Sequence, residues 1–262
     1  MDDAYGYAET AVGFYERELA ANGQIIRPAL SLSDIEENVS ENKISSILAL
    51  EGGEPLGGDL GKLRHFFNRG VRLTTLTWNR ENALGYGALT GSDLGLKPFG
   101  KACIESMDAL GMIIDVSHLN EAGFWDVCAL AERPFMASHS NARAVTGHKR
   151  NLTDGQIRAV AAKGGIIGLN LCPAFLNETE KADINDIYRH IERFLALGAG
   201  EHIGLGCDFD GVPSLPEGVL GVSSLKYLNE ALVEKFGAAI AGNIMSRNFY
   251  AFFTRFFSPC KP

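Results

Sequence analysis

Residues 113–120, with the sequence IIDVSHLN, contain a short apolar run that ends in Ser117 and His118. Residues 134–141, PFMASHSN, repeat this pattern, and Ser138 and His139 follow the apolar run there. A short apolar run without alternation is typical of a strand that is buried on both faces, as in a parallel sheet. Two parallel strands that end in Ser-His would present two imidazoles at the same edge of that sheet.

Four further apolar runs flank these two, and stretches with helical spacing separate them. The runs are residues 44–51, 70–79, 165–171 and 202–210. Pro98 and Gly111 suit the start and the end of one helix, and Thr153 or Asp154 can cap another. Ser33 and Glu36 fit a capping box at the start of a third helix. Alternating strands and helices predict an α/β chain with parallel strand pairing.

Polar residues follow the apolar runs on the carboxyl side, and their distribution favours one architecture. They are Glu51, Trp78, Asn79, His118, His139, Asn170 and Asp208. In a barrel every strand end points to one mouth, whereas an open doubly wound sheet uses only its switch point. Functional-looking residues after five or six different strands therefore favour a (β/α)₈ TIM-like barrel. We expect one domain over residues 1–262.

The composition excludes several classes of protein. A net charge of −8 and a pI near 5.3 argue against a nucleic-acid binder, which normally presents a basic patch. The five cysteines include no C-x-x-C pair, so a reducing, cytoplasmic location is predicted rather than a disulfide framework. The sequence shows no apolar signal peptide at its start, and no apolar run reaches the ~20 residues of a transmembrane segment.

The glutamate, the histidines and the aspartate share one chemistry. Neutral imidazoles and carboxylates are the usual ligands of Zn²⁺, and a bridging carboxylate can hold two metal ions. Each residue also has a structural interpretation. Glu51 could cap the following turn, Asp208 could form a turn before Gly211, and Arg150 could be a solvated residue at a helix entry. Cys207 suits a small core residue, and we expect structural or surface roles for His65, His148, His190 and His202.

Seven segments together resemble the signature segments of the membrane (renal) dipeptidase family. In order they are ALEGGEPLG, GVRLTTLTWNRENALG, LGMIIDVSHLN, PFMASHSNARAV, KRNLTDGQIRAV, GGIIGLN and HIGLGCDFDGVP. The resemblance extends over essentially the whole chain. It implies a (β/α)₈ barrel with a two-zinc site in which a metal-bound hydroxide hydrolyses dipeptides, so the chain is expected to be a metallo-dipeptidase.

The resemblance also implies a role for individual residues. Glu51 matches the carboxylate that bridges both metals, and His118 and His139 match ligands of one metal. Asp208 matches a ligand of the other metal and a proton acceptor, which makes Glu51 and Asp208 the expected catalytic residues. Three residues are expected to bind substrate: Arg150, on the substrate carboxylate, and Trp78 and Asn79, in the pocket wall where animal members have a histidine instead of Trp78.

One motif of the family is absent. The family carries His-x-Asp on its first strand, whereas this sequence has no histidine before His65 and no His-x-Asp anywhere. Six strands are visible, so the expected barrel lacks its first two strands. We then expect one Zn²⁺ rather than two, impaired hydrolysis, and open strand edges that invite a homo-oligomer.

Two alternatives remain open. The chain could be a non-catalytic dipeptidase-like barrel that binds one metal or a partner, which the absent His-x-Asp would explain. It could also be an unrelated α/β enzyme such as an aldolase-like barrel. That enzyme needs a Schiff-base lysine at a strand end, where this sequence has none.

Overall fold

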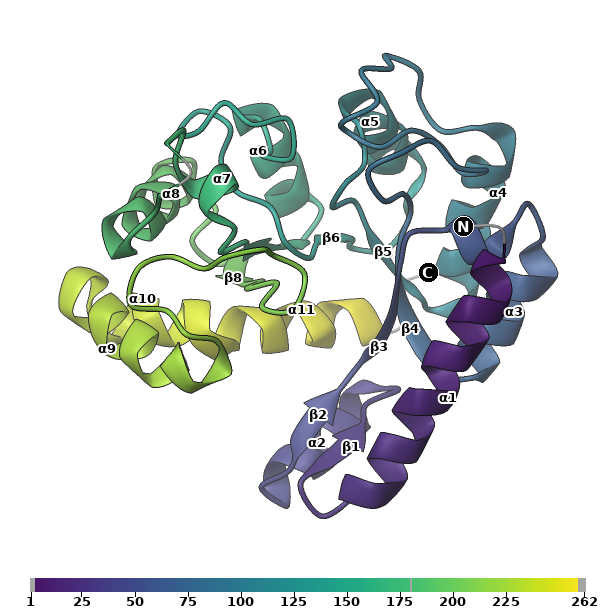
Figure 1. Cartoon of the computed structure of the whole chain (residues 1–262), viewed down its shortest axis with the longest axis horizontal. Helices are drawn as coiled ribbons and strands as arrows, with labels where there is room; N and C mark the ends of the chain where they lie inside the picture. Colours follow the sequence, from purple (N-terminus) through teal and green to yellow (C-terminus); the bar gives the residue numbers. More distant parts are fainter. Residues whose placement is uncertain (1–2, 180, 259–262) are drawn as a thin grey trace. The chain divides into compact units, whose positions relative to one another are not determined.

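The computed structural model describes residues 3–179 and 181–258, and Figure 1 shows the elements that they form. The chain divides into two compact units, which we call the first unit (Met1–Arg133 with Phe256–Pro262) and the second unit (Pro134–Arg255). Each unit alternates parallel strands with helices, so the predicted α/β class is confirmed in both.

The first unit is built on three parallel strands. Its elements are α1 (Ala4–Asn22), β1 (Ile26–Pro28), α2 (Leu32–Ser40), β2 (Ile44–Ser46), β3 (Leu48–Glu51), the 3₁₀ helix η1 (Glu54–Leu56), α3 (Leu60–Asn68), β4 (Val71–Thr75), α4 (Pro98–Leu110), β5 (Ile113–Asp115) and α5 (Glu121–Leu130). Strands β3, β4 and β5 lie side by side in chain order. Glu51 lies opposite Thr75, and Thr75 lies opposite Asp115. The carboxyl ends of the three strands are therefore level.

The second unit repeats this plan with a different set of terminal helices. Its elements are β6 (Met136–Ala137), α6 (Asp154–Ala162), β7 (Ile166–Leu169), α7 (Pro173–Leu176), α8 (Ile184–Ala196), β8 (Ile203–Leu205), the 3₁₀ helix η2 (Val222–Ser224), α9 (Leu225–Phe236), α10 (Ala238–Gly242), the π-helical turn η3 (Asn243–Arg247) and α11 (Asn248–Phe257). Strands β6, β7 and β8 are parallel and follow chain order, with Met136 opposite Ile166 and Ile167 opposite Ile203.

Two of the three predicted helix signals are found in the structure. Helix α4 has Pro98 in its first turn and ends on Gly111, whose φ of 73° is left-handed. Thr153 and Gln156 form a full capping box on α6. The predicted box of Ser33 and Glu36 is wrong.

The residues that start α2 are Ser31 and Asp34, two positions earlier than predicted. The Ser31 side chain accepts a hydrogen bond from the Asp34 backbone N–H, and the Asp34 carboxylate accepts one from the Leu30 N–H at 2.8 Å. These two bonds satisfy donors at the helix start. Starting the helix at Leu32 also places Ile35 and Asn38 on its buried face.

The apolar run at residues 44–51 forms two strands instead of the single one expected. Its first half is β2, which pairs with β1 in a separate two-stranded parallel sheet. Its second half is β3, which pairs with β4. Strand β1 is only three residues long and contains Pro28, so its sequence carries neither an apolar run nor an alternating pattern.

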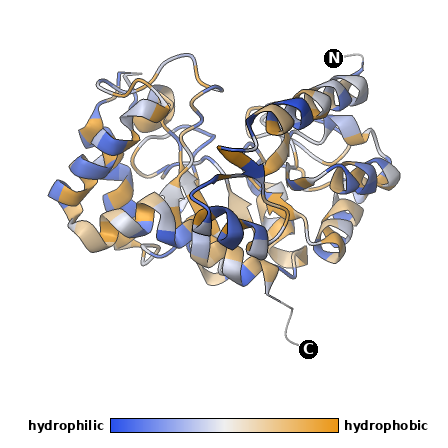
Figure 2. Cartoon of the chain, turned by 90° about the horizontal axis from the view of Figure 1, so that it is seen from below, coloured by the Kyte–Doolittle hydropathy of each residue, from blue (hydrophilic) through white to orange (hydrophobic). Residues whose placement is uncertain are grey.

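Apolar side chains of the helices and strands form the core of each unit. In the first unit α4 contacts α3 and α5, and Phe66, Ile104 and Phe124 are almost fully buried. Helix α11 buries two of its phenylalanines, Phe252 at 0% and Phe256 at 1% exposure. Figure 2 shows hydrophilic and hydrophobic residues together on most helices, as expected for helices with one buried face. Among the described residues, no helix has the length and apolar character that crossing a membrane requires.

Candidate metal centre

His118 follows strand β5 in a turn that a buried carboxylate organises. Asp115, the last residue of β5, is fully buried and accepts hydrogen bonds from the Thr75 hydroxyl at 2.6 Å and the Ser117 backbone N–H at 3.0 Å. These bonds offset part of the cost of burying a carboxylate. His118 has a φ of 67°, in the left-handed region that non-glycine residues rarely occupy. The chain thus leaves the strand abruptly and turns the imidazole back toward the strand ends.

Both nitrogens of the His118 ring face polar atoms of the first unit. Its Nε2 lies 3.1 Å from Oε1 of Glu51, the last residue of β3. Its Nδ1 lies 2.9 Å from Oδ1 of Asn79. His118 is 7% exposed, whereas the Glu51 side chain is 49% exposed. A buried imidazole therefore meets a carboxylate that solvent can reach.

His139 occupies the corresponding position after strand β6. It is 8% exposed, and its Nδ1 lies 2.7 Å from the Ser138 hydroxyl. The next residue, Ser140, donates its backbone N–H to the carbonyl of Gly168 at 2.7 Å. The ladder with β7 therefore continues past His139 and fixes its backbone.

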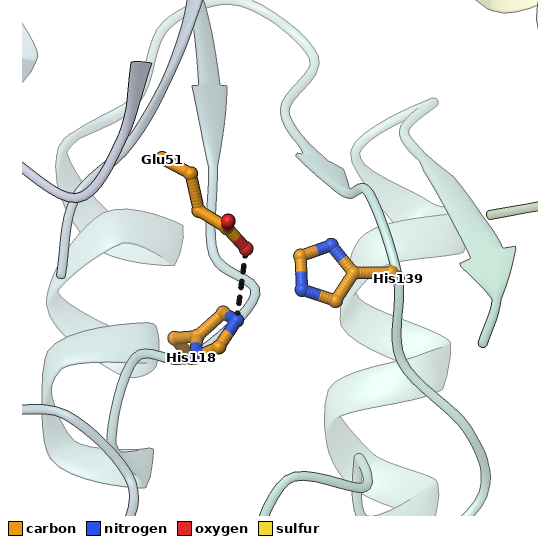
Figure 3. A group of neighbouring side chains, drawn as sticks. All are labelled: Glu51, His118 and His139. Carbon is orange, nitrogen blue, oxygen red and sulfur yellow. Dashed lines mark ion pairs between the residues drawn. The ribbon is translucent and has the colours of Figure 1, made fainter. Parts of the chain in front are cut away.

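Glu51, His118 and His139 form a group that could hold a metal ion, with ligand atoms within 4.8 Å of one another (Figure 3). The donor set is two imidazole nitrogens and one carboxylate oxygen, which is a set that zinc-type ions accept, and three protein ligands are enough for a catalytic site. The residues present therefore fit a divalent metal ion. Among the described residues, the group consists of these three side chains and does not include Asp208.

Asp208 lies beyond strand β8 in the second unit. Its φ is 58°, and its Oδ2 accepts a hydrogen bond from Nδ2 of Asn170 at 3.1 Å. Asn170 is fully buried, and its own Oδ1 accepts from the backbone N–H of Cys172 at 2.6 Å. The backbone of Asn170 is bonded on both sides by the Asn141 carboxamide. One end of the Asp208 carboxylate is thus held by a rigid amide.

Arg150 is a buried cation of the second unit. It is 4% exposed, and its guanidinium carbon lies 5.6 Å from the centre of the Phe175 ring. Its backbone N–H donates to Nδ1 of His148 at 3.2 Å. A buried guanidinium that stacks on an aromatic ring can bind a carboxylate at its edge through two parallel hydrogen bonds.

Two cysteines adjoin these residues. Burial raises the pKa of the Cys172 thiol, and the negative charge of Asp208 raises it further. Burial also raises the pKa of the Cys207 thiol to about 12. Both groups therefore stay protonated at neutral pH, which does not suit a nucleophile, although Cys207 is half-buried and not a fully buried core residue.

Trp78 and Asn79 differ in their surroundings. The Trp78 ring is 48% exposed and lies 6.2 Å from the His118 ring, centre to centre. Asn79 is half-buried and its side chain is directed at His118. The contact between Asn79 and His118 was not predicted from the sequence, because the sequence Trp78-Asn79 does not indicate where the Asn79 side chain points.

The remaining histidines bond to protein groups, as expected of structural residues. His65 lies 2.9 Å from Glu9, and His202 lies 2.8 Å from the carbonyl of Gly165. His190 is fully buried, and both its ring nitrogens are engaged, with the Ala142 N–H and the Leu176 carbonyl. Burial lowers the pKa of His190 to about 4.

An α/β chain with imidazoles and a carboxylate gathered after parallel strands belongs to the class of metal-binding α/β proteins. Comparison with known proteins specifies the family. The chain belongs to the membrane dipeptidase family, Peptidase family M19, whose sequence model matches residues 2–254.

Individual relatives agree with this membership. An uncharacterized protein in the pqqA 5′ region of Klebsiella pneumoniae is 34% identical over 234 residues, which cover 85% of this chain and 86% of that protein. The uncharacterized dipeptidase C965.12 of Schizosaccharomyces pombe is 34% identical over 205 residues, or 76% of this chain and 49% of the yeast protein. The chain therefore spans about half of that relative.

The fold also agrees with a solved structure. A metallopeptidase from Rhodobacter sphaeroides, crystallised with a phosphinate mimic of the dipeptide L-Ala-D-Ala, is 30% identical with a TM-score of 0.87. The match covers 94% of this chain and 72% of that protein. The barrel-like α/β fold that the sequence predicts is confirmed, with six parallel strands described in its sheet.

Proposed function

We propose that this chain hydrolyses dipeptides with one zinc ion held by Glu51, His118 and His139. The observation that carries the proposal is the grouping of these three ligand atoms within 4.8 Å in a member of the dipeptidase family. Two imidazoles and one carboxylate leave a coordination position for water or substrate, which is the pattern of catalytic rather than structural zinc. When bound, the ion would supply a Lewis acid and lower the pKa of water at the site.

The remaining polar residues divide the other tasks. Arg150 would bind the terminal carboxylate of the substrate through its guanidinium, which selects dipeptides over longer chains because their carboxylate lies next to the scissile bond. Asp208 would accept a proton from the attacking water and pass it to the leaving amine. The exposed ring of Trp78 and the Nδ2 group of Asn79 would line the pocket for the substrate.

For a chain of these 262 residues we propose one metal ion rather than two. Glu51 and Asp208 would be the only family ligands left for a second metal, because no His-x-Asp occurs in the sequence. Two carboxylates without an imidazole bind zinc weakly. We therefore expect slower hydrolysis than in relatives that carry the full ligand set.

Elemental analysis of zinc per chain, with dipeptide hydrolysis measured on the same sample, tests the proposal. One zinc per chain with measurable turnover is expected, and His118→Ala and His139→Ala should each lose the metal and the activity together. The Asn68→Leu variant, altered at the exposed end of α3, is the control that should keep both. Full zinc occupancy in both histidine variants would overturn the ligand assignment.

A second candidate function is a non-catalytic metal-binding barrel, which the absent His-x-Asp favours. One zinc per chain without turnover on a panel of dipeptides would support this alternative and exclude the hydrolase. The metal ligands would be the same in both cases. The activity measurement therefore separates the two functions.

We also propose that open strand edges allow a homo-oligomer. Within the described sheet order, β3 and β8 each have one neighbouring strand, and an unpaired edge can pair with another chain. Light scattering during size-exclusion chromatography is the measurement, and a monodisperse monomer would contradict the proposal. The cytoplasmic location stays a prediction from cysteine usage.

A further inference from the structure

The contact between Asn79 and His118 fixes which ring nitrogen faces the metal ligands. The Oδ1 atom of Asn79 lies 2.9 Å from Nδ1 of His118, and a carbonyl oxygen can only accept a hydrogen bond. Nδ1 therefore carries a proton and donates it to Asn79. Nε2 lies 3.1 Å from the Glu51 carboxylate, and it is the nitrogen whose lone pair a metal ion would take in place of a proton.

We propose that Asn79 is a positioning residue for the metal ligand His118, selecting the tautomer whose Nε2 can bind a metal. The inference rests on the proposed function in so far as it treats His118 as a ligand. A ligating histidine usually donates its other ring N–H to a protein acceptor, and that bond fixes both tautomer and ring orientation. Asn79 supplies that acceptor in the first unit.

A short segment connects the backbones of both partners. The Ala88 backbone N–H donates to the carbonyl of His118 at 2.7 Å, and the N–H of the preceding Gly87 donates to the carbonyl of Arg80 at 3.1 Å. Gly87 also forms an isolated bridge with Leu119. Residues 87–88 therefore hold the loop that carries Asn79 and the turn that carries His118 at a fixed separation.

Gly87 is necessary for this arrangement because the Asn79 loop passes directly over it. A Cβ atom at position 87 would lie 2.3 Å from the carbonyl oxygen of Trp78 and 2.6 Å from the carbonyl carbon of Asn79. Both atoms belong to the backbone and cannot rotate away. The absence of a side chain at Gly87 thus lets the Asn79 loop approach closely.

The choice of an amide over a carboxylate also affects the charge of the site. With Asn79 as the acceptor, the supporting amide adds no charge of its own beside the Glu51 carboxylate and the two imidazoles. An aspartate would keep the acceptor and make the imidazole more basic, so it would strengthen metal binding. A leucine of similar size would remove the acceptor.

Two measurements test the role of Asn79 in the variants Asn79→Leu and Asn79→Asp, with Asn68→Leu as the control. The first is the tautomer of His118 in metal-free protein, read from long-range proton–nitrogen correlations in a histidine-labelled sample. The second is zinc affinity in competition with a chromophoric chelator. We expect the leucine variant to lose the Nδ1–H tautomer and to bind zinc about 10- to 100-fold more weakly. The aspartate variant should bind at least as tightly as the wild type, and the control should match it.

A leucine variant that keeps both the Nδ1–H tautomer and wild-type zinc affinity would overturn the proposal. Should that variant fail to fold, Asn79→Gln replaces it, because one added methylene displaces the carbonyl while keeping the side chain polar. A wild-type protein that binds no zinc would refute the proposed function. The tautomer measurement would still decide the role of Asn79, because it needs no metal.

Discussion

His118 and Asp208 are alike in local structure but differ in how firmly they are held. Both follow a parallel strand, both have a left-handed backbone, with φ of 67° and 58°, and both are hydrogen-bonded to an asparagine carboxamide, to which His118 donates and from which Asp208 accepts. His118 is 7% exposed and has Glu51, Asn79 and Ala88 as partners. Asp208 is half-buried, and the loop that follows it is largely exposed.

The difference is consistent with different tasks. A metal ligand must keep one geometry, so a buried ring with both nitrogens engaged suits it. A residue that carries a proton must reach two different atoms during a reaction, so a carboxylate with one oxygen tied to Asn170 suits that role. Substitutions near His118 should therefore affect metal binding, whereas substitutions near Asp208 should affect turnover.

The largest expected effect separates the two residues directly. The variant Asp208→Asn has a carboxamide in place of the carboxylate. The carboxamide cannot accept a proton, so kcat should fall by about 10²- to 10⁴-fold. Zinc content should stay at the wild-type level, whereas His118→Ala should lose it. The exposed neighbour Asp210 gives the control Asp210→Asn, which should leave both unchanged. Loss of zinc in Asp208→Asn would show that Asp208 is a ligand of the same metal.

The next effect concerns the stability of the second unit at low pH. His190 has a pKa of about 4 in the folded protein, below the ordinary value of 6.5, because it is buried. The unfolded chain binds the proton more readily between these values, so stability is full above pH 6.5 and falls as pH drops toward 4. The gap corresponds to about 3 kcal/mol of unfolding free energy.

His190→Gln offers the check, because glutamine can donate and accept but does not titrate. Denaturant unfolding at about pH 7.5 and about pH 4 should show a smaller difference in the variant than in the wild type. The loop from Asn141 to Asn151, which His190 holds through the Ala142 N–H, should be affected first. An unchanged pH dependence in the variant would mean that another group controls acid unfolding.

Two glycine substitutions test whether the surroundings of His118 are more rigid than those of Asp208. Gly87→Ala brings a Cβ against backbone atoms of Trp78 and Asn79, so we expect a loss of about 1–3 kcal/mol in unfolding free energy and weaker zinc binding. In Gly211→Ala the added Cβ would lie 2.1 Å from Oδ1 of Asp208. The Asp208 side chain can rotate away from it. Stability should change by under about 0.5 kcal/mol there, while turnover slows. Equal losses of stability in the two variants would refute the distinction.

The smallest effect is expected at Trp78. Its ring is 48% exposed, so Trp78→Phe should change unfolding free energy by less than about 0.5 kcal/mol. As a pocket wall it should alter KM between small and bulky dipeptides by up to about 10-fold while kcat changes little. A fall in kcat comparable to that of Asp208→Asn would place Trp78 in the chemistry instead.

Much of this arrangement could be predicted from sequence because the signals are local. The apolar runs locate the strands, and the polar residue that follows each run locates Glu51, His118, His139 and Asp208. Pro98 and Thr153 mark helix starts through their own backbone and side-chain chemistry. Such features depend on neighbouring residues, so they can be recognised without knowledge of the tertiary structure.

The features that escaped prediction depend on residues far apart in the chain. The start of α2 was misplaced because Ser31 and Ser33 are both good caps, and only the buried face of the helix decides between them. The Asp115 carboxylate accepts a hydrogen bond from Thr75, which is 40 residues away in the chain. The Asn79–His118 contact spans 39 residues. Spacing along the chain carries no information about such pairs.

The raised pKa values of Cys172 and Cys207 have a practical consequence for handling the protein. Alkylating reagents and mild oxidants attack thiolates, and these two thiols hold their protons at neutral pH. Reagents such as iodoacetamide should therefore leave both residues unmodified in the folded protein. Their labelling would then report loss of native structure around Asp208, which gives a simple assay for the integrity of a purified sample.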